Sequence, residues 1–242
     1  QSQMQNVGTL LDGDVQGKLQ GMSKQLKQVS IDTGAATSDL TDGLYQVVSA
    51  FGESAESVKQ LEIAAKAAKA GNATTTDSVN MLSAVTKGYG DTSAAALQKA
   101  SDLAFLTVKL GQTSFPELAS SMGQVVPLAA TMKVSQEELF GAMATLTGVT
   151  GGTAEVTTQL RATMQEFLSP SSQMEKALKK MGYTSGAAAL ESEGLGGILT
   201  KLKESVKGDE VAFANLFSSI ESKNAVLALT GAQADAFAEK TA

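Results

Sequence analysis

The stretch Ser135-Gln-Glu-Glu-Leu-Phe-Gly-Ala-Met-Ala-Thr-Leu-Thr-Gly148 carries the start and stop signals of one complete short helix. Ser135 stands three residues before Glu138, which is the spacing of a capping box. In that motif the serine oxygen accepts a hydrogen bond from the third helical amide, and the glutamate bonds back to the cap amide. Gly148 closes the apolar run, as glycine does at many helix C-termini. These signals predict a helix over residues 136–147.

The same signals recur on both sides of this stretch. Ser114 precedes Glu117, and Ser172 precedes Glu175, at the spacing of a capping box. Other apolar runs end at Gly52, Gly71, Gly88, Gly111 and Gly182. The predicted helices cover residues 39–51, 54–70, 76–88, 92–110, 115–132, 136–147, 153–168 and 172–181. Because the joining loops are short, we expect an all-α fold, a multi-helix array of short antiparallel helices.

The N-terminal segment has an apolar stripe of its own. Its members are Met4, Leu11, Val15, Leu19, Met22, Leu26 and Val29. After Leu11 they are spaced three or four apart, close to a coiled-coil heptad with one stutter. Gly13, Gly17 and Gly21 add a smooth face on the same predicted helix. Two interpretations stay open, a flexible connector and a coiled-coil-like helix that meets copies of itself.

If copies meet along this stripe, replacing Leu19 and Leu26 by Asp should reduce their association more than it unfolds the rest of the chain.

The sequence pattern changes after Tyr183, where several glycines interrupt the helical periodicity. We therefore expect three regions: a helical connector over residues 1–37, a helical core over 38–182 and a C-terminal region of short helices over 183–242.

Composition excludes several kinds of chemistry. The chain has 242 residues without Cys or His, so thiol nucleophiles, imidazole bases and most zinc, haem and iron–sulfur sites are excluded. A net charge of −6 and a single arginine, Arg161, argue against specific nucleic-acid binding. The longest charge-free stretches are shorter than the roughly 20 residues of a membrane-spanning helix. Since the chain begins with Gln and has no basic and apolar leader, we expect a fragment or a processed product.

A few motifs resemble functional sites, and each has a simpler structural interpretation. The five residues from Thr86 to Gly90 are typical of a helix C-terminus, and the glycine-rich residues 148–153 lack the Lys-Ser/Thr of a phosphate-binding loop. The adjacent acidic pairs are Glu137 with Glu138 and Asp209 with Glu210, and a small basic face holds Lys176, Lys179 and Lys180. The acidic pairs fall in predicted first helical turns and the lysines near a predicted helix C-terminus, where each sign of charge is stabilised by the helix dipole. We predict no enzyme, and no catalytic, cofactor-binding or metal-binding residue.

The order of several short motifs is similar to one known family. They are Leu40 to Ala50, Ala64 to Gly71, Phe115 to Ala119, Ala129-Ala130, Val134 to Leu139, Ala142 to Leu146 and Thr157 to Arg161. In this order they resemble the conserved core of tail tape measure proteins from long-tailed phages, or the equivalent from a prophage or contractile tail-like particle. The resemblance covers residues 38–182 and extends to Gly231 through Leu216 to Ala225. Lys133 departs from the pattern, which usually has Gly there.

The resemblance implies a structural protein of the phage tail that sets tail length, takes part in tail assembly and leaves during genome ejection. The apolar and glycine stripe of the N-terminal segment and the rotational symmetry of a tail lumen favour self-association, which we expect as three copies around the tail axis. We also expect contacts with tail tip, baseplate or tube proteins. The expected places are the virion tail, the host cytoplasm during assembly and the host envelope on infection. The alternative is a membrane-active module that helps DNA through the host envelope. A lytic enzyme domain is disfavoured because His and Cys are missing.

Overall fold

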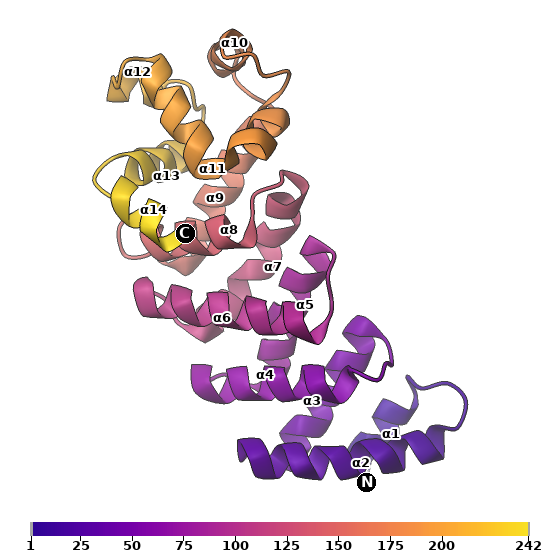
Figure 1. Cartoon of the computed structure of the whole chain (residues 1–242). Coiled ribbons are helices and arrows are strands. Elements are labelled where there is room, and N and C mark those ends of the chain that lie inside the picture. Colours follow the sequence, from indigo (N-terminus) through magenta and orange to yellow (C-terminus); the bar gives the residue numbers. More distant parts are fainter. Residues whose placement is uncertain (1, 242) are drawn as a thin grey trace. The chain divides into compact units, whose positions relative to one another are not determined.

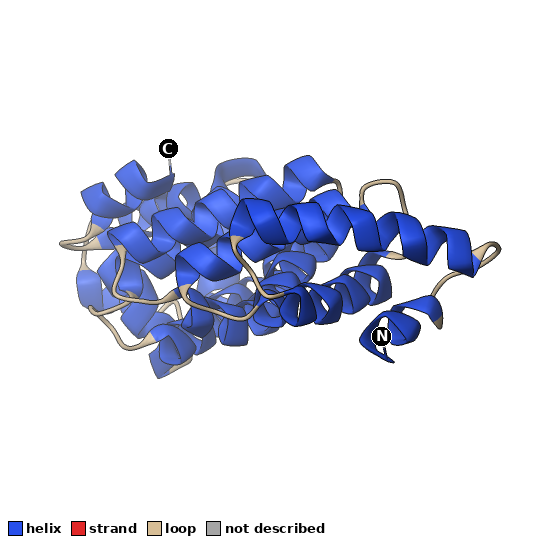
Figure 2. Cartoon of the chain, turned by 90° about the horizontal axis from the view of Figure 1, so that it is seen from below, coloured by secondary structure: helices blue, strands red, loops and turns tan. Residues whose placement is uncertain are grey.

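The computed structural model describes residues 2–241 and is all-α (Figures 1 and 2). No strand occurs in this range; Thr147 and Gly151 form one isolated bridge. The helices are α1 (Ser2–Gly8), α2 (Val15–Thr33), α3 (Thr37–Phe51), α4 (Ser57–Gly71), α5 (Thr75–Tyr89), α6 (Ala94–Leu110), α7 (Phe115–Thr131), α8 (Gln136–Leu146), α9 (Thr153–Leu168), α10 (Ser172–Lys180), α11 (Gly186–Ser205), α12 (Glu210–Ala214), α13 (Ile220–Thr230) and α14 (Ala234–Thr241). The predicted fold class is confirmed.

Contacts between residues divide the chain into two compact units. Unit 1 is the chain up to Phe105 together with Ser114–Gly123, and unit 2 is Leu106–Thr113 together with the chain from Gln124 onward. Helices α6 and α7 contribute residues to both units. This division describes packing, so the three expected regions, 1–37, 38–182 and 183–242, stay a prediction.

In unit 1 each of the helices α1, α2 and α3 packs on the next helix in sequence and on the helix after that. Helix α3 contacts α1, α4 and α5, and α4 contacts α2 as well. The close approach depends on small side chains, because Ala64, Ala65, Ala67 and Ala68 are all buried on α4. Gly43 of α3 also allows a close approach, to α5, because a Cβ at this position would lie 2.5 Å from Cγ2 of Thr75. The predicted packing of sequential helices is therefore present, with a second set of contacts between alternate helices.

The continuous N-terminal helix is a prediction that the structure corrects. Helix α1 ends at Gly8 and α2 begins at Val15; Gly13 lies between them with φ of 74°, outside any helix. Met22, Leu26 and Val29 of the stripe are buried inside their own unit, where α2 packs on α3 and α4. A face that packs within the chain has the same apolar spacing as a face that meets another copy.

The three predicted capping boxes have three different outcomes. At Ser114 the full box forms: the amide of Glu117 donates to the serine oxygen at 3.4 Å, and the amide of Ser114 donates to the Glu117 carboxylate at 2.9 Å. Ser135 caps the Glu138 amide at 3.1 Å, but the Glu138 carboxylate bonds elsewhere. The third box is wrong. Ser171, one residue earlier, caps α10 through the Met174 amide.

Some predicted stop signals also lie one or two residues away from the real ones. Gly52, Gly148 and Gly182 have positive φ at or just beyond helix ends, and Gly111 directly follows α6, as expected. Gly71 is the last residue of α4, and the left-handed cap is Asn72. Gly88 lies within α5, which ends at the left-handed Gly90. Lys133, at the position where the resemblance leads one to expect Gly, adopts the left-handed conformation with φ of 61°.

Unit 2 is built around α8, α9 and α13. Residues 139–146 of α8 are all buried, and α14 packs along this helix. Gly141 allows that approach, because a Cβ there would lie 2.5 Å from Cγ2 of Thr241. Helix α13 packs along α9, and Phe167 and Phe217 meet edge to face with ring centroids 6.2 Å apart. Helix α11 contacts α8, α9, α10, α12 and α13.

Candidate functional site

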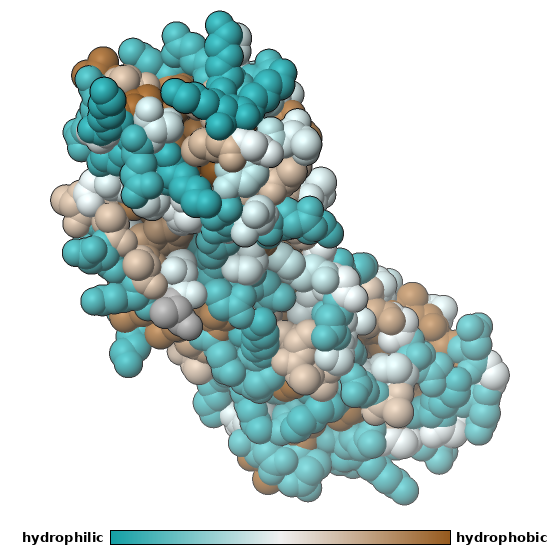
Figure 3. All heavy atoms as spheres, turned by 45° about the horizontal axis from the view of Figure 1, so that its top comes forward, coloured by the Kyte–Doolittle hydropathy of each residue, from teal (hydrophilic) through white to brown (hydrophobic). Residues whose placement is uncertain are grey.

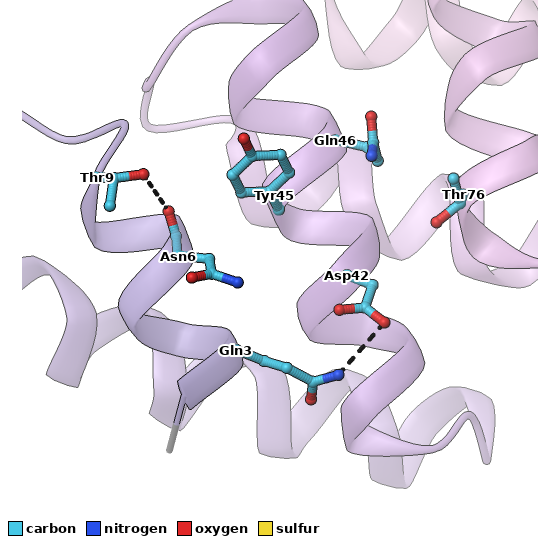
Figure 4. A pocket seen from close by; sticks show the side chains of 7 residues that line it. All are labelled: Gln3, Asn6, Thr9, Asp42, Tyr45, Gln46 and Thr76. Atoms are coloured by element: carbon cyan, nitrogen blue, oxygen red, sulfur yellow. Dashed lines mark hydrogen bonds between the residues drawn. The ribbon is translucent and has the colours of Figure 1, made fainter.

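A polar cleft lies on unit 1 between α1, α3 and α5 (Figure 4). Its volume is about 410 Å³, and its lining consists of Gln3, Asn6, Thr9, Asp42, Tyr45, Gln46 and Thr76. Asp42, Tyr45 and Gln46 are spaced three and one apart, which places them on one face of α3. Val7 and Leu11 are buried and hold α1 and the following turn against the unit. The cleft is therefore formed by one face of α3, with α1 and the turn after it on one side and α5 on the other.

Few of the polar groups in this cleft bond to one another. The Gln3 side-chain amide donates to the Asp42 carboxylate at 3.4 Å, and the Thr9 hydroxyl donates to the Asn6 backbone carbonyl at 2.7 Å (Figure 4). No hydrogen bond within the described residues engages the side chains of Asn6, Tyr45, Gln46 or Thr76. The cleft thus exposes amide and hydroxyl groups and a single carboxylate to solvent.

In unit 2 a buried carboxylate holds the start of another helix. Glu166 of α9 is 9% exposed, and it accepts the backbone amides of Ser218 at 2.6 Å and Ser219 at 2.8 Å. It also accepts the Ser219 hydroxyl at 2.9 Å. Burial alone would raise the pKa of Glu166, but the hydrogen bonds from Ser219 and Ser218 outweigh burial and leave this pKa below its ordinary value. Glu166 therefore fixes the N-terminus of α13 on α9.

Glu138 performs a similar task for α11. That helix breaks at Gly194, whose φ of 70° and ψ of 174° are not helical. Beyond the break, the amide of Gly196 donates to the Glu138 carboxylate at 3.2 Å. Because free amides at the start of a helical segment attract negative charge, Glu138 stabilises the second half of α11. This explains why its side chain does not complete the capping box of α8.

A third polar cluster lies on the surface of unit 2. The Tyr183 hydroxyl donates to the Glu193 carboxylate at 2.5 Å, and Lys201 forms an ion pair with Glu193 at 2.8 Å. Hydrogen bonds from Lys201 and Tyr183 lower the pKa of Glu193, and the same contacts raise the pKa of Lys201. The cluster ties the residues before the Gly194 break to those after it.

The remaining motifs noted in the sequence lie at helix ends, in one loop and in a surface ion pair. Thr86 to Gly90 form the C-terminal end of α5, and residues 148–153 join α8 to α9. Glu137 lies in the first turn of α8. Asp209 caps α12 through the Ala212 amide, and Lys179 pairs with Glu175 on α10. The structure brings none of these features into the cleft, whose lining was not predicted.

Two further findings concern ions and membranes. The described residues contain no group of three or more acidic side chains placed to hold a metal ion. Among residues 2–241, no helix has both the length and the apolar character needed to cross a lipid bilayer.

The face shown in Figure 3 is mostly hydrophilic, with small apolar areas. Single exposed apolar side chains such as Ile31, Val211 and Ile220 are ordinary on a protein surface.

The fold and these contacts define an all-helical protein whose helix ends are held by carboxylates from neighbouring helices. Comparison with protein families then assigns it more closely. Residues 23–236 match the phage-related minor tail protein family. The chain belongs to this family, and it is a component of a phage-type tail. Comparisons with curated proteins and with solved structures gave no match.

Proposed function

We propose that this chain is the core segment of a tail tape measure protein, which controls tail length during assembly and leaves the tail during genome ejection. The observation that carries the proposal is the family match over residues 23–236. The order of motifs from Leu40 to Arg161 supports the finer assignment to tape measure proteins. The proposed places are the tail lumen or tip, the host cytoplasm during assembly and the host envelope on infection.

We also propose that the chain works through protein contacts and not as an enzyme. Two acidic side chains that attracted attention for acid–base chemistry have structural tasks, since Glu138 and Asp209 each accept a backbone amide at the start of a helix. With peptidoglycan or peptide substrates we expect no turnover. If replacement of Glu137 or Glu138 by Ala abolished a genuine hydrolytic activity, this part of the proposal would be wrong.

The proposed partners are other copies of the chain and neighbouring tail tip, baseplate or tube proteins. A cyclic arrangement of three copies would match the rotational symmetry of a tail. Contacts between copies would use exposed faces, because Met22, Leu26 and Val29 of α2 are already buried in their own unit. No specific contact with nucleic acid is proposed, since the acidic chain has a single arginine.

The test is removal of the gene from the phage or prophage that encodes it, followed by electron microscopy of the particles and a DNA-delivery assay. A tape measure role predicts that tails are missing or have no defined length, and that a plasmid copy restores them. Tails of normal length that fail to deliver DNA would contradict this role and favour the membrane-active alternative.

A further inference from the structure

The polar cleft of unit 1 is lined by seven side chains with polar groups, four of them exposed and three half-buried. Its seven side chains come from α1, the turn after it, α3 and α5, and the side chains of Asn6, Tyr45, Gln46 and Thr76 make no hydrogen bond within the described residues. Figure 4 shows Gln3 and Asn6 facing Asp42 and Tyr45 across the gap between α1 and α3, with Gln46 and Thr76 toward α5. Each amide can donate and accept at once, and each hydroxyl can do both.

The charge of the cleft limits what can bind there. The lining contains one carboxylate, Asp42, and no Lys or Arg. A phosphate or another anion would meet a negative site without a cation to pair with, so anionic ligands are disfavoured. A hard metal ion requires about six or more oxygen ligands, several of them charged, whereas this lining offers a single carboxylate.

The shape and polarity of the cleft limit the ligand further. Apolar ligands bind in pockets lined mainly by hydrophobic side chains, and here every lining side chain carries a polar group. Peptides are recognised at sheet edges, in apolar grooves or by Arg clusters, and the lining of this cleft offers none of these. A volume of about 410 Å³ lies in the usual range for sites that bind small molecules.

We propose that this cleft binds a neutral polyhydroxylated molecule, a short saccharide. The amides of Asn6 and Gln46 and the hydroxyl of Thr76 bond to sugar hydroxyls, each as donor or acceptor. The Asp42 carboxylate accepts hydroxyl protons, and the Tyr45 ring packs against the C–H face of a sugar ring. Because the site is open and polar, we expect weak binding with a Kd of about 1 mM. This inference does not depend on the tape measure role.

Fluorine NMR of the full chain labelled with 3-fluorotyrosine tests the proposal directly. The chain has three tyrosines, Tyr45, Tyr89 and Tyr183, and the Tyr45→Phe variant assigns the signal of the cleft. The probes are maltotriose and the trimer of N-acetylglucosamine, with inorganic phosphate and a Gly-Ser peptide in parallel titrations. We expect the Tyr45 signal alone to shift and to saturate with at least one of the two sugars.

Variants separate specific binding from a general solvent effect. The double variant Gln46→Ala with Thr76→Ala should weaken sugar binding about tenfold, because two hydrogen-bonding groups are lost. The matched control is Gln25→Ala, an exposed amide on α2 outside the cleft, which should leave the affinity unchanged. Circular dichroism confirms that each variant folds.

Three results would overturn the proposal. In the first, the Tyr45 signal shows no saturable shift with either sugar up to its solubility limit. In the second, the double variant binds as tightly as the unaltered chain. In the third, the signal responds to the peptide or to phosphate and not to the sugars, which would assign the cleft to another class of ligand.

Discussion

Glu166 shows how much one side chain contributes to the fold of unit 2. Its carboxylate, on α9, accepts two backbone amides and one hydroxyl at the start of α13. These amides belong to the N-cap residue of α13, Ser219, and to the residue before it, and they lie in a partly buried place where an unpaired amide would be costly. The contact between α9 and α13 therefore depends on a negative charge at this position.

We predict that Glu166→Gln destabilises the protein by about 1.5–3 kcal/mol at neutral pH, the usual loss when hydrogen bonds to a buried charged group are weakened. Urea unfolding followed by far-UV circular dichroism measures the change. The matched control is Glu239→Gln, an exposed carboxylate of the same unit, which should change stability by less than about 0.5 kcal/mol. Equal effects of the two variants would show that Glu166 does not hold α13.

The pH dependence of this difference has a definite sign. The pKa of Glu166 in the folded protein is lower than its ordinary value of 4.5. Its stabilising effect is therefore complete above pH 4.5 and is lost as the pH falls through the lowered pKa of the folded state. The stability difference between the unaltered protein and Glu166→Gln should be constant from pH 7 to about 5.5 and narrow below pH 4.5. A difference that grows on acidification would contradict the assignment.

Residue-level prediction from the sequence succeeded where the partners are neighbours in the chain. The Ser114 box forms because both of its bonds join residues three apart. Glu138 and Glu166 bond to residues more than 50 positions away, and no local pattern indicates such a partner. At the start of α10 two serines, Ser171 and Ser172, stand side by side, and the sequence alone did not identify the one that caps.

Among the elements, α2 differs most from its sequence-based interpretation. Leu26 is 1% exposed in the packing of unit 1, whereas Leu19 is half-buried. Heptad spacing indicates that a helix has an apolar face, but it carries no information on whether that face meets another helix of the same chain or a second copy. Helix α2 contacts α1, α3 and α4, so helices of the same chain cover its apolar face.

We predict that Leu26→Ala destabilises unit 1 by about 2–5 kcal/mol, because it removes a fully buried side chain and leaves a cavity. Leu19→Ala should cost less, because Leu19 is only half-buried and part of its side chain already lies in water in the folded protein. Thermal and urea unfolding of the two variants measure the difference. Replacing Leu26 by Asp should likewise unfold α2. If it left stability unchanged and reduced only the association of copies, our view of α2 would be wrong.

The break in α11 gives a second prediction for an element. Gly194 has a backbone conformation that is nearly exclusive to glycine, and a Cβ there would lie 2.6 Å from Oε1 of Glu138. Gly194→Ala should therefore destabilise unit 2 by about 1–3 kcal/mol. Gly21→Ala, on the exposed face of α2 with no atom within 4 Å of the new Cβ, should stabilise by up to about 1 kcal/mol. Differential scanning calorimetry checks both signs. If Gly194→Ala left the stability unchanged or raised it, the backbone at Gly194 would not require glycine.

At the scale of the whole molecule, the all-helical class was predictable because capping residues, glycine stops and apolar spacing agree over most of the chain. The candidate site was not. Asp42, Tyr45 and Gln46 form no recognised chemical motif, and their meeting with α1 and Thr76 depends on how helices pack. Packing between alternate helices, such as α1 with α3 and α3 with α5, leaves no signature in a local sequence pattern.

The central claim is that this member of the minor tail protein family is the core segment of a tape measure protein. The most direct measurement is a cryo-electron microscopy density map of the assembled tail from the particle that encodes the chain. We predict density for the helices of unit 1 and unit 2 inside the tail tube or at its tip, in three copies around the tail axis. A map that accounts for the whole tail without these helices, or that places them outside the tube and tip, would contradict the claim.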